Sequence, residues 1–332
     1  MRNVILVLTN SEDGLHSDVV ISKLTESGEN VFRFDVDKFS RGEATITFSP
    51  SPEYDGCIIS NSNDSIRVKD IKSIWYRRPN HFNLPIKDPV QRDYAEKEVR
   101  LFLDAVWSLL EQQEHIFFLS RPSSIEKARR KLLQLDFAKQ CGMQIPRTII
   151  TNDPKKVRIF HKSCPNGMIF KAVNYEFLNY GEKSYNVPTT LITPEHLRKI
   201  DIIRKTPAIF QELIQKKYEL RITVVGKKIF PVKIDSQSNP LTIVDWRNPL
   251  CIEHLGYSMT TIDPRIETFC LEMLRNFNLQ FGAFDFIIDR EEELYFLEVN
   301  PNGQWYWLED TAGVLISDAI TDILKTERRR ET

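Results

Sequence analysis

The sequence predicts a mixed α/β and α+β fold class, with a small N-terminal α/β domain followed by two lobes. Strand-like and helix-like apolar patterns alternate in the N-terminal part, which is typical of an open α/β sheet. Beyond about residue 145, hairpins of short strands mix with helices, which indicates α+β lobes. We place the N-terminal domain at residues 1–120, a central lobe with its linker helix at 121–215, and a C-terminal lobe at 216–332.

The N-terminal domain is predicted from three strand patterns and two helix patterns. We expect strands at residues 3–9, 30–39 and 73–79, and a helix at 15–27 between the first two strands. A long amphipathic helix is expected at 90–114. Its predicted buried stripe consists of Tyr94, Val99, Phe102, Leu103, Val106 and Leu110.

A second helix is expected to lead into the central lobe. It starts near Ser123, where Glu126 completes a capping pattern, and runs unbroken to Gly142 as its C-cap. Short strands are expected after it, separated in places by helices. These strands are TIIT, MIFKAV, AIFQELI, LRITVV, KIFPVKI, FGAFDFIID and ELYFLEV.

Composition excludes several functional classes. The 332 residues are 41% hydrophobic and 27% charged, as in a soluble globular protein, and the formal net charge is −1. This charge gives no reason to expect a nucleic-acid partner. No apolar run approaches the roughly 18 residues that span a bilayer, so no membrane partner is expected either. The apolar run near the N-terminus lacks a small-residue cleavage site and is interpreted as a first strand, not a signal peptide.

The cysteines and histidines are dispersed. Five cysteines occur without a CxxC pair, and six histidines occur without an HxxxH pair. This pattern predicts reduced thiols in a cytoplasmic protein and argues against a zinc site.

The segment FGAFDFIIDREEELYFLEVN, residues 281–300, predicts a β-hairpin that brings two acids together. With residues 290–293 as the tip, symmetric pairing sets Asp289 against Leu294, Ile287 against Phe296, and Asp285 against Glu298. Directly opposed Cβ atoms lie about 4.5–5.5 Å apart, and like charges there destabilise a sheet. Asn300 falls on the same face as Glu298 because side chains alternate along a strand.

A bound cation would explain the two opposed carboxylates. Mg²⁺ takes carboxylate oxygens together with substrate phosphates, and Asn300 would add an amide oxygen. Two other interpretations remain open: a solvated acid beside a salt-bridged one, or the acid and nucleophile of a retaining glycosidase, about 5–5.5 Å apart.

Several cations lie on predicted strands. Lys171 lies mid-strand among apolar neighbours and needs a negative partner, either a phosphate or a protein carboxylate. Lys233 in KIFPVKID also lies on a predicted strand and likewise needs a negative partner. Arg221, facing inward on its strand, suits a phosphate oxygen because a guanidinium is a fixed fork of donors.

A strand that runs into a linker is predicted to read a nucleobase. Residues Gln211, Glu212, Leu213 and Ile214 offer backbone N–H and C=O groups to an adenine edge, and Glu219 could accept from ribose hydroxyls. The chain has neither GxxxxGK[ST] nor GxGxxG, so a nucleotide would bind outside the Walker and Rossmann motifs.

The order of these motifs resembles the ATP-grasp superfamily over roughly residues 120–325. The resemblance rests on a helix lysine, Lys131, then Lys171, then the 211–214 hinge with Glu219, and finally Asp285, Glu298 and Asn300 in the form D…ExN. It implies the ATP-grasp fold with ATP and Mg²⁺ as cofactors. Lys131, Lys171 and Lys233 would contact phosphates, and the D…ExN set would hold the metal.

Four stretches resemble the microviridin-type macrocyclases, which cross-link ribosomally made peptides called graspetides. They are IWYRRP, QIPRTIITNDP, YELRITVVGKKIFPVKIDSQ and VDWR. The resemblance implies a ligase that joins Asp or Glu side chains of a precursor peptide to Thr, Ser or Lys side chains of the same peptide. It also implies recognition of a leader segment in the precursor and a homodimer.

The sequence departs from the superfamily at the cation that usually precedes the first magnesium acid. Ala283 stands at this position, and we assign the catalytic charge to Arg221 or Arg247. A loop near residues 173–188 is expected to cover the phosphates.

Arg77, Arg78 and Asp235 are weaker candidates for contact with the substrate. Arg77 and Arg78 point to opposite faces of a strand, so one could face the peptide and the other a structural acid, although a structural role for both is as plausible. Arg247 could instead hold a substrate carboxylate in a bidentate pair. Asp235 is a candidate general base for the second step.

Three functional classes follow from these observations. The first is the peptide macrocyclase. The second is another ATP-grasp ligase, which adds amino acids to a protein tail or to a small-molecule carboxylate. The third is a non-catalytic nucleotide-binding protein, which would leave the lysine and carboxylate set without a role.

Overall fold

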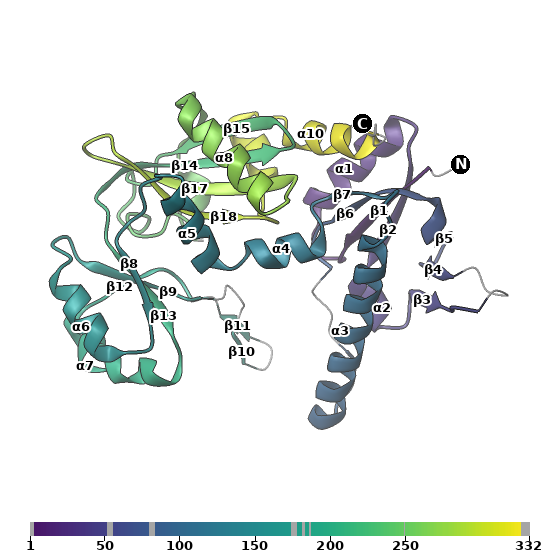
Figure 1. Cartoon of the computed structure of the whole chain (residues 1–332), viewed down its shortest axis with the longest axis horizontal. Helices are drawn as coiled ribbons and strands as arrows, with labels where there is room; N and C mark the ends of the chain where they lie inside the picture. Colours follow the sequence, from purple (N-terminus) through teal and green to yellow (C-terminus); the bar gives the residue numbers. More distant parts are fainter. Residues whose placement is uncertain are drawn as a thin grey trace.

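The computed structural model describes residues 3–51, 56–79, 84–173, 178–180, 183–185, 187–248 and 250–326. Three bodies are visible in Figure 1: an N-terminal domain, a small central lobe and a C-terminal lobe. Two short helices lead the chain from the N-terminal domain into the central lobe, and the second of them packs on the C-terminal lobe. No helix in the described ranges is long and apolar enough to cross a membrane.

The N-terminal domain is built on a parallel sheet with the order β2-β1-β6-β7. β1 is buried along its whole length. The helices α1 and α3 lie next to this sheet (Figure 1). A second, antiparallel sheet has the order β3-β4-β5. The elements are β1 (Val4–Thr9), α1 (Leu15–Glu26), β2 (Asn30–Asp35), α2 (Val36–Ser40), β3 (Thr45–Phe48), β4 (Cys57–Ser60), β5 (Ser65–Arg67), β6 (Ile71–Tyr76), α3 (Pro89–Glu111) and β7 (Phe117–Leu119).

Two predictions about this domain are wrong in part. The strand predicted at 30–39 ends at Asp35, and its second half forms α2. In α3, Leu103, Val106 and Leu110 are buried as predicted, but the side chains of Tyr94 and Phe102 are 65% and 37% exposed. Tyr94 is exposed because the first half of this long helix extends away from the sheet (Figure 1). Phe102 lies in the second half, where its ring stacks on that of Phe39 and is only partly covered.

The helix predicted to run from Ser123 to Gly142 is two helices. α4 (Pro122–Ala128) ends at Arg129, and α5 (Lys131–Gln140) begins after Arg130, whose backbone is extended. The expected capping pair is also absent: Ser123 donates from its N–H and its hydroxyl to Glu111. Gly142 closes α5 with a φ of 71°, as predicted for a C-cap glycine. The break matters because it makes Lys131 the first residue of a new helix.

The central lobe is a four-stranded sheet with the order β12-β9-β13-β8 and flanking helices. Its own small core includes Val157, Met168 and Phe210. The elements are β8 (Thr148–Thr151), α6 (Pro154–Lys162), β9 (Met168–Lys171), β12 (Thr190–Leu191), α7 (Pro194–Arg198) and β13 (Ala208–Glu212).

The C-terminal lobe is a five-stranded antiparallel sheet with the order β16-β15-β14-β17-β18. One face packs against α8 in a core where the rings of Phe269, Phe286 and Phe296 meet edge to face. The last helix packs on α1, β6 and β7 of the N-terminal domain. The elements are β14 (Lys216–Val225), β15 (Lys228–Ile234), β16 (Tyr257–Met259), α8 (Pro264–Asn276), β17 (Phe281–Asp289), β18 (Leu294–Asn300), α9 (Tyr306–Ala312) and α10 (Ile316–Lys325).

The predicted hairpin is present, but its register changes along its length. Asp285 pairs with Glu298 as predicted, whereas Ile287 pairs with Tyr295 and not with Phe296. The ladder shifts between Asp285 and Phe286, so Leu297 is the extra residue of a β-bulge. The symmetric four-residue tip is therefore wrong, and the bulge restores the pairing of the two acids.

Candidate active site

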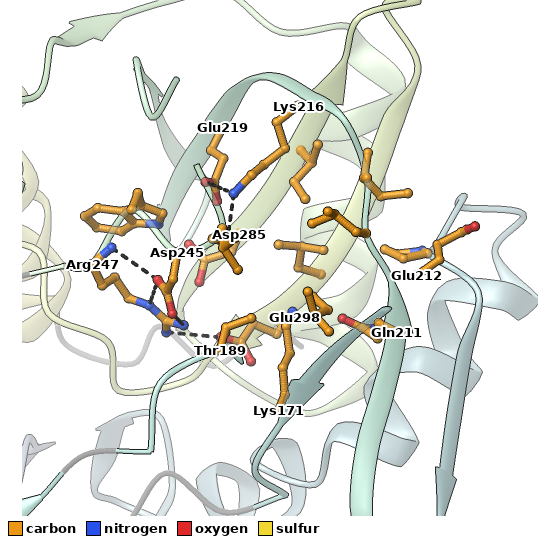
Figure 2. A pocket seen from close by; sticks show the side chains of 18 residues that line it. Lys171, Thr189, Gln211, Glu212, Lys216, Glu219, Asp245, Arg247, Asp285 and Glu298 are labelled. Carbon is orange, nitrogen blue, oxygen red and sulfur yellow. Dashed lines mark hydrogen bonds and ion pairs between the residues drawn. The ribbon is translucent and has the colours of Figure 1, made fainter. Parts of the chain in front are cut away.

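An open pocket lies between the central lobe and the C-terminal sheet. In the view of Figure 2, Gln211 and Glu212 lie at one end and Asp245 and Arg247 at the other. Its apolar lining consists of Pro146, Ile169, Leu213, Ile214, Val244, Trp246, Ile287 and Leu297. Its polar lining consists of Lys171, Thr189, Gln211, Glu212, Lys216, Glu219, Asp245, Arg247, Asp285 and Glu298.

Glu298 is the acid on which the cations converge. Lys131 Nζ lies 3.0 Å from Glu298 Oε2, and Arg247 Nη1 lies 3.9 Å from Oε1. Burial alone would raise the pKa of this carboxyl, but Lys131, Arg247 and Lys171 outweigh burial and lower the pKa to about 2. Glu298 is therefore an anion at neutral pH although its side chain is buried.

Gln134 explains why Lys131 reaches Glu298. β18 is the edge strand of its sheet, and the Gln134 side chain bonds its backbone as a neighbouring strand would. Its Nε2 donates to Val299 O at 2.9 Å, and its Oε1 accepts from Val299 N at 2.9 Å. Lys131 lies one turn earlier on the same helix, so this docking sets the lysine beside Glu298, the residue that precedes Val299 in β18.

Asp285 is held by the cation that the sequence assigned to catalysis. Arg221 Nη1 donates to Asp285 Oδ1 at 2.8 Å, and its Nη2 donates to Gln304 O at 3.0 Å. Asn300 Nδ2 donates to the other oxygen, Oδ2, at 3.2 Å. Burial raises the pKa of Asp285, and Arg221 opposes that rise. Arg221, on β14, thus supplies beside Asp285 the positive charge that Ala283 lacks.

Lys171 and Arg247 supply the remaining positive charge of the pocket. Burial lowers the pKa of Lys171 to about 8, although Glu298 favours the charged form. Arg247 is held in a bidentate pair by Asp245, with Nε and Nη2 at 2.8 and 2.9 Å from its two oxygens. This pair lowers the pKa of Asp245 against the effect of burial.

At the other end of the pocket, the hinge residues lie as predicted along its wall. The Glu212 carboxylate accepts from Arg147 Nε at 2.7 Å, so its side chain is structural. Gln211 is 3% exposed, and its Oε1 has no hydrogen-bond partner within the described part of the chain. Such an atom can accept a hydrogen bond from a ligand.

Glu219 lies in the pocket, and sequence analysis missed its partner. Lys216 Nζ donates to Glu219 Oε1 at 2.7 Å and to Val244 O at 3.1 Å (Figure 2). A spacing of three would set these two residues on opposite faces of a regular strand. The ladder shifts between Lys216 and Tyr218, and this bulge brings Lys216 to the side of Glu219.

Lys233 and Asp235 are not brought to the pocket. Lys233 pairs with Leu220, whereas Arg221 pairs with Asp285, so Lys233 lies on the opposite face of the sheet. Its ammonium sits 4.6 Å from the ring centroid of Tyr218. The predicted phosphate contact of Lys233 is therefore wrong for this arrangement. Asp235 is exposed beyond the end of β15 and outside the pocket lining.

Arg77 is the structural member of the predicted arginine pair. Its side chain is 1% exposed, its Nε lies 3.2 Å from Asp13, and its Nη1 donates to Asn302 O and Gly303 O. Arg78 is half-buried, and burial lowers its pKa. Neither residue lines the pocket. The loop predicted to cover the phosphates, residues 173–188, contains a short antiparallel hairpin of β10 (Leu178–Tyr180) and β11 (Lys183–Tyr185). Residues 174–177, 181–182 and 186 of this loop lie outside the described residues, so its predicted role stays a prediction.

Comparison with known proteins decides what kind of site this is. The N-terminal residues 4–125 match the family described as the MvdD pre-ATP grasp domain. The macrocyclase MdnC from Microcystis aeruginosa MRC, solved bound with precursor peptide MdnA, is 31% identical to this chain. The alignment covers 97% of this chain and 98% of MdnC, with a TM-score of 0.85.

The chain belongs to the ATP-grasp macrocyclases. The resemblance drawn from the sequence motifs is thereby confirmed, and so are the ATP-grasp fold and the ligase class.

Two further macrocyclase-like structures agree. A RiPP-associated ATP-grasp ligase from Chryseobacterium gregarium, solved with ADP and a leader and core peptide, is 29% identical over 97% of this chain and 96% of its own, with a TM-score of 0.86. MdnB from Microcystis aeruginosa MRC is 30% identical over 97% of this chain and 99% of its own, with a TM-score of 0.81. No curated protein sequence matches this macrocyclase significantly.

Proposed function

We propose that this enzyme closes rings in a ribosomally made precursor peptide that carries a leader and a core. It would join Asp or Glu side-chain carboxylates of the core to Thr or Ser hydroxyls as esters, or to Lys amines as amides, at the expense of ATP. The observation that carries the proposal is the convergence of Lys131, Lys171 and Arg247 on Glu298 in a pocket with an apolar far end. The peptide-bound relatives support it.

ATP fits the pocket by its chemistry. The adenine ring matches the apolar end, where the Gln211 side chain and the hinge backbone can meet its polar edge. Glu219 can accept hydrogen bonds from the ribose hydroxyls, because Lys216 donates to only one of its two carboxylate oxygens, Oε1. Lys131 and Lys171 supply positive charge for the phosphates at the centre of the pocket.

Mg²⁺ fits the donor set of Asp285, Glu298 and Asn300. The set offers carboxylate and amide oxygens, which are hard ligands, and Glu298 is already ionised. Within the described residues, no three His, Cys, Asp or Glu side chains gather, so two carboxylates, the amide and substrate phosphates would complete the shell. When bound, the ion would neutralise charge on the phosphates.

The proposed chemistry has two steps, and the residues mainly position and neutralise charge. A core carboxylate oxygen attacks the γ-phosphorus and ADP leaves, which converts the poorly electrophilic carboxylate into an acylphosphate. A hydroxyl or amine of the core then attacks the carbonyl carbon, its proton passes to a base, and inorganic phosphate leaves. Arg247, held flat by Asp245, suits the incoming carboxylate, and Arg221 suits the transferred group.

Intact-mass spectrometry of a candidate precursor tests the proposal. The purified enzyme is incubated with precursor, ATP and Mg²⁺, with ADP release measured in parallel. The proposal requires loss of one water mass per bond, and both the mass loss and the peptide-dependent ADP release must vanish in Glu298→Gln. A gain of amino-acid mass would instead identify a tail-extending ATP-grasp ligase.

Two expectations stay predictions: the homodimer that the family resemblance implies and the cytoplasmic location that the cysteine pattern predicts. A homodimer would give twice the chain mass of 38.8 kDa in light scattering. All five cysteines are free thiols, which supports the proposal that the enzyme works in the reducing cytoplasm.

A further inference from the structure

Thr148 and Gln211 face each other at the hinge end of the pocket. Thr148 lies on β8 and Gln211 on β13, and the two residues are directly opposed in the antiparallel ladder. Opposed side chains lie on the same face and in contact range. Gln211 Nε2 donates to Thr148 Oγ1 at 3.0 Å.

A second hydrogen bond fixes which end of the Gln211 amide faces Thr148. Thr148 Oγ1 donates to Pro146 O at 2.7 Å. A hydroxyl has one hydrogen, so once that hydrogen is used the oxygen can only accept from other groups. The amide nitrogen of Gln211 must therefore face Thr148, and its Oε1 must face elsewhere.

The Oε1 atom of Gln211 is buried at the wall of the pocket and, among the described residues, lacks a hydrogen-bond partner. Gln211 as a whole is 3% exposed. A buried acceptor without a partner destabilises a protein, so a ligand that supplies a donor gains from meeting it. Ile169, Leu213 and Pro146 make the surrounding wall apolar, which excludes most competing donors.

We propose that Thr148 is a positioning residue that makes this enzyme select adenine. Its hydroxyl locks the Gln211 amide with the oxygen toward the base, where it accepts from a 6-amino group and repels a 6-oxo group. The inference rests on the proposed binding of ATP in this pocket and deepens it. Without the lock, the amide could turn over and offer its nitrogen to a 6-oxo purine.

The test compares ATP with ITP, two nucleotides that differ at the 6-position of the base. Dissociation constants are measured by calorimetry with Mg²⁺ and without peptide, for wild type, Thr148→Val, Thr148→Ala and Thr148→Ser. We expect the wild type to prefer ATP by about tenfold or more, as a buried hydrogen bond gained or lost would give. Thr148→Val and Thr148→Ala should narrow that ratio severalfold, mainly by binding ITP more tightly, and Thr148→Ser should keep it.

The ratio is taken on one protein sample at a time, so a loss of stability common to both nucleotides cancels. An unchanged ATP-to-ITP ratio in both hydroxyl-free variants overturns the inference while the proposed function stands. If the wild type binds neither nucleotide, the proposed function fails and the inference falls with it.

Discussion

Glu298 and Lys171 show how the same burial can act on two charges with opposite outcomes. Glu298 stays ionised because Lys131 and Arg247 are close enough to outweigh burial, whereas burial dominates at Lys171 and lowers its pKa to about 8. Lys171 is therefore a cation at neutral pH but close to losing its proton. A bound polyphosphate would stabilise the protonated, positively charged form of Lys171.

The lowered pKa of Lys171 predicts a pH-dependent affinity for ATP. Below pH 8 the ammonium is present and attracts the phosphates, whereas above pH 8 it is increasingly neutral and binding must take up a proton. The Kd for ATP should rise from pH 8 to pH 9.5, by up to about tenfold per pH unit. Titration calorimetry across this range checks it, and Lys171→Arg should flatten the curve. A flat wild-type curve would contradict the assignment.

Lys216 connects Glu219, at the proposed ribose site, to Val244 in the segment that carries Arg247. Lys216→Met removes the bonds to Glu219 and Val244 O, leaving a buried carboxylate unpaired and the segment at 244–247 less constrained. We expect KM for ATP to rise by about tenfold or more and kcat to fall as well. The matched control is Lys217→Met, which removes an exposed lysine next in the chain. Steady-state kinetics showing equal KM values for the two variants would sink the prediction.

At the scale of elements, two β-bulges decide what the sequence could and could not predict. The pairing of Asp285 with Glu298 was predictable because strand alternation and a short tip constrain it, although the tip register was wrong and the bulge at Leu297 made up the difference. The bulge at Lys217 hid Lys216 from any argument based on alternation. The prediction for Lys233 was wrong because its local sequence pattern resembles that of Lys171 but does not show the pairing of its strand. That pairing turns the Lys233 side chain away from Asp285.

Contacts between elements that are distant in the sequence could not be predicted from the pattern of each segment taken separately. The docking of α5 on β18 through Gln134 depends on which strand ends at the edge of the sheet. Lys131 was found through the order of family motifs, while Gln134, which positions it, carries no local signal.

The turn after β18 offers a prediction at the same scale. A Cβ at Gly303 would lie 2.8 Å from Arg221 Nη2 and 2.8 Å from Ala283 Cβ. Gly303→Ala should push Arg221 from Asp285 and lower kcat by about 10²-fold, as loss of a charge-stabilising group does. Gly256→Ala is the control, because its added Cβ would make an ordinary 3.5 Å contact with Asp235. Equal kcat values for the two variants would contradict this role of the turn.

At the scale of the whole molecule, a buried ion pair joins the N-terminal domain to the active-site turn. Asp13 and Arg77 are both buried in the N-terminal domain, and the same guanidinium donates to Asn302 O and Gly303 O at 3.0 and 2.9 Å. The next residue, Gln304, accepts from Arg221. The N-terminal domain is thus connected to Arg221 through three consecutive residues, 302–304.

Breaking this pair should affect stability and activity separately. Arg77→Met leaves Asp13 buried and unpaired, and should lower the free energy of unfolding by about 3–5 kcal/mol. Adding Asp13→Leu should recover much of that loss, because two apolar groups can replace a buried pair. Activity should stay low in the double variant, since the turn has still lost its donor. Denaturant unfolding and kcat together check this, and a fully active double variant would refute the coupling.

If the core carboxylate is activated by phosphoryl transfer beside Glu298, one of its oxygen atoms leaves with the phosphate, and an isotope label can follow that atom. A precursor whose Asp or Glu side chains carry heavy oxygen is turned over with ordinary ATP, and the released phosphate is weighed by mass spectrometry. The acylphosphate route predicts one heavy oxygen in the phosphate for every bond formed, with both signals lost in Glu298→Gln. Ring formation that releases phosphate with no heavy oxygen would contradict the account.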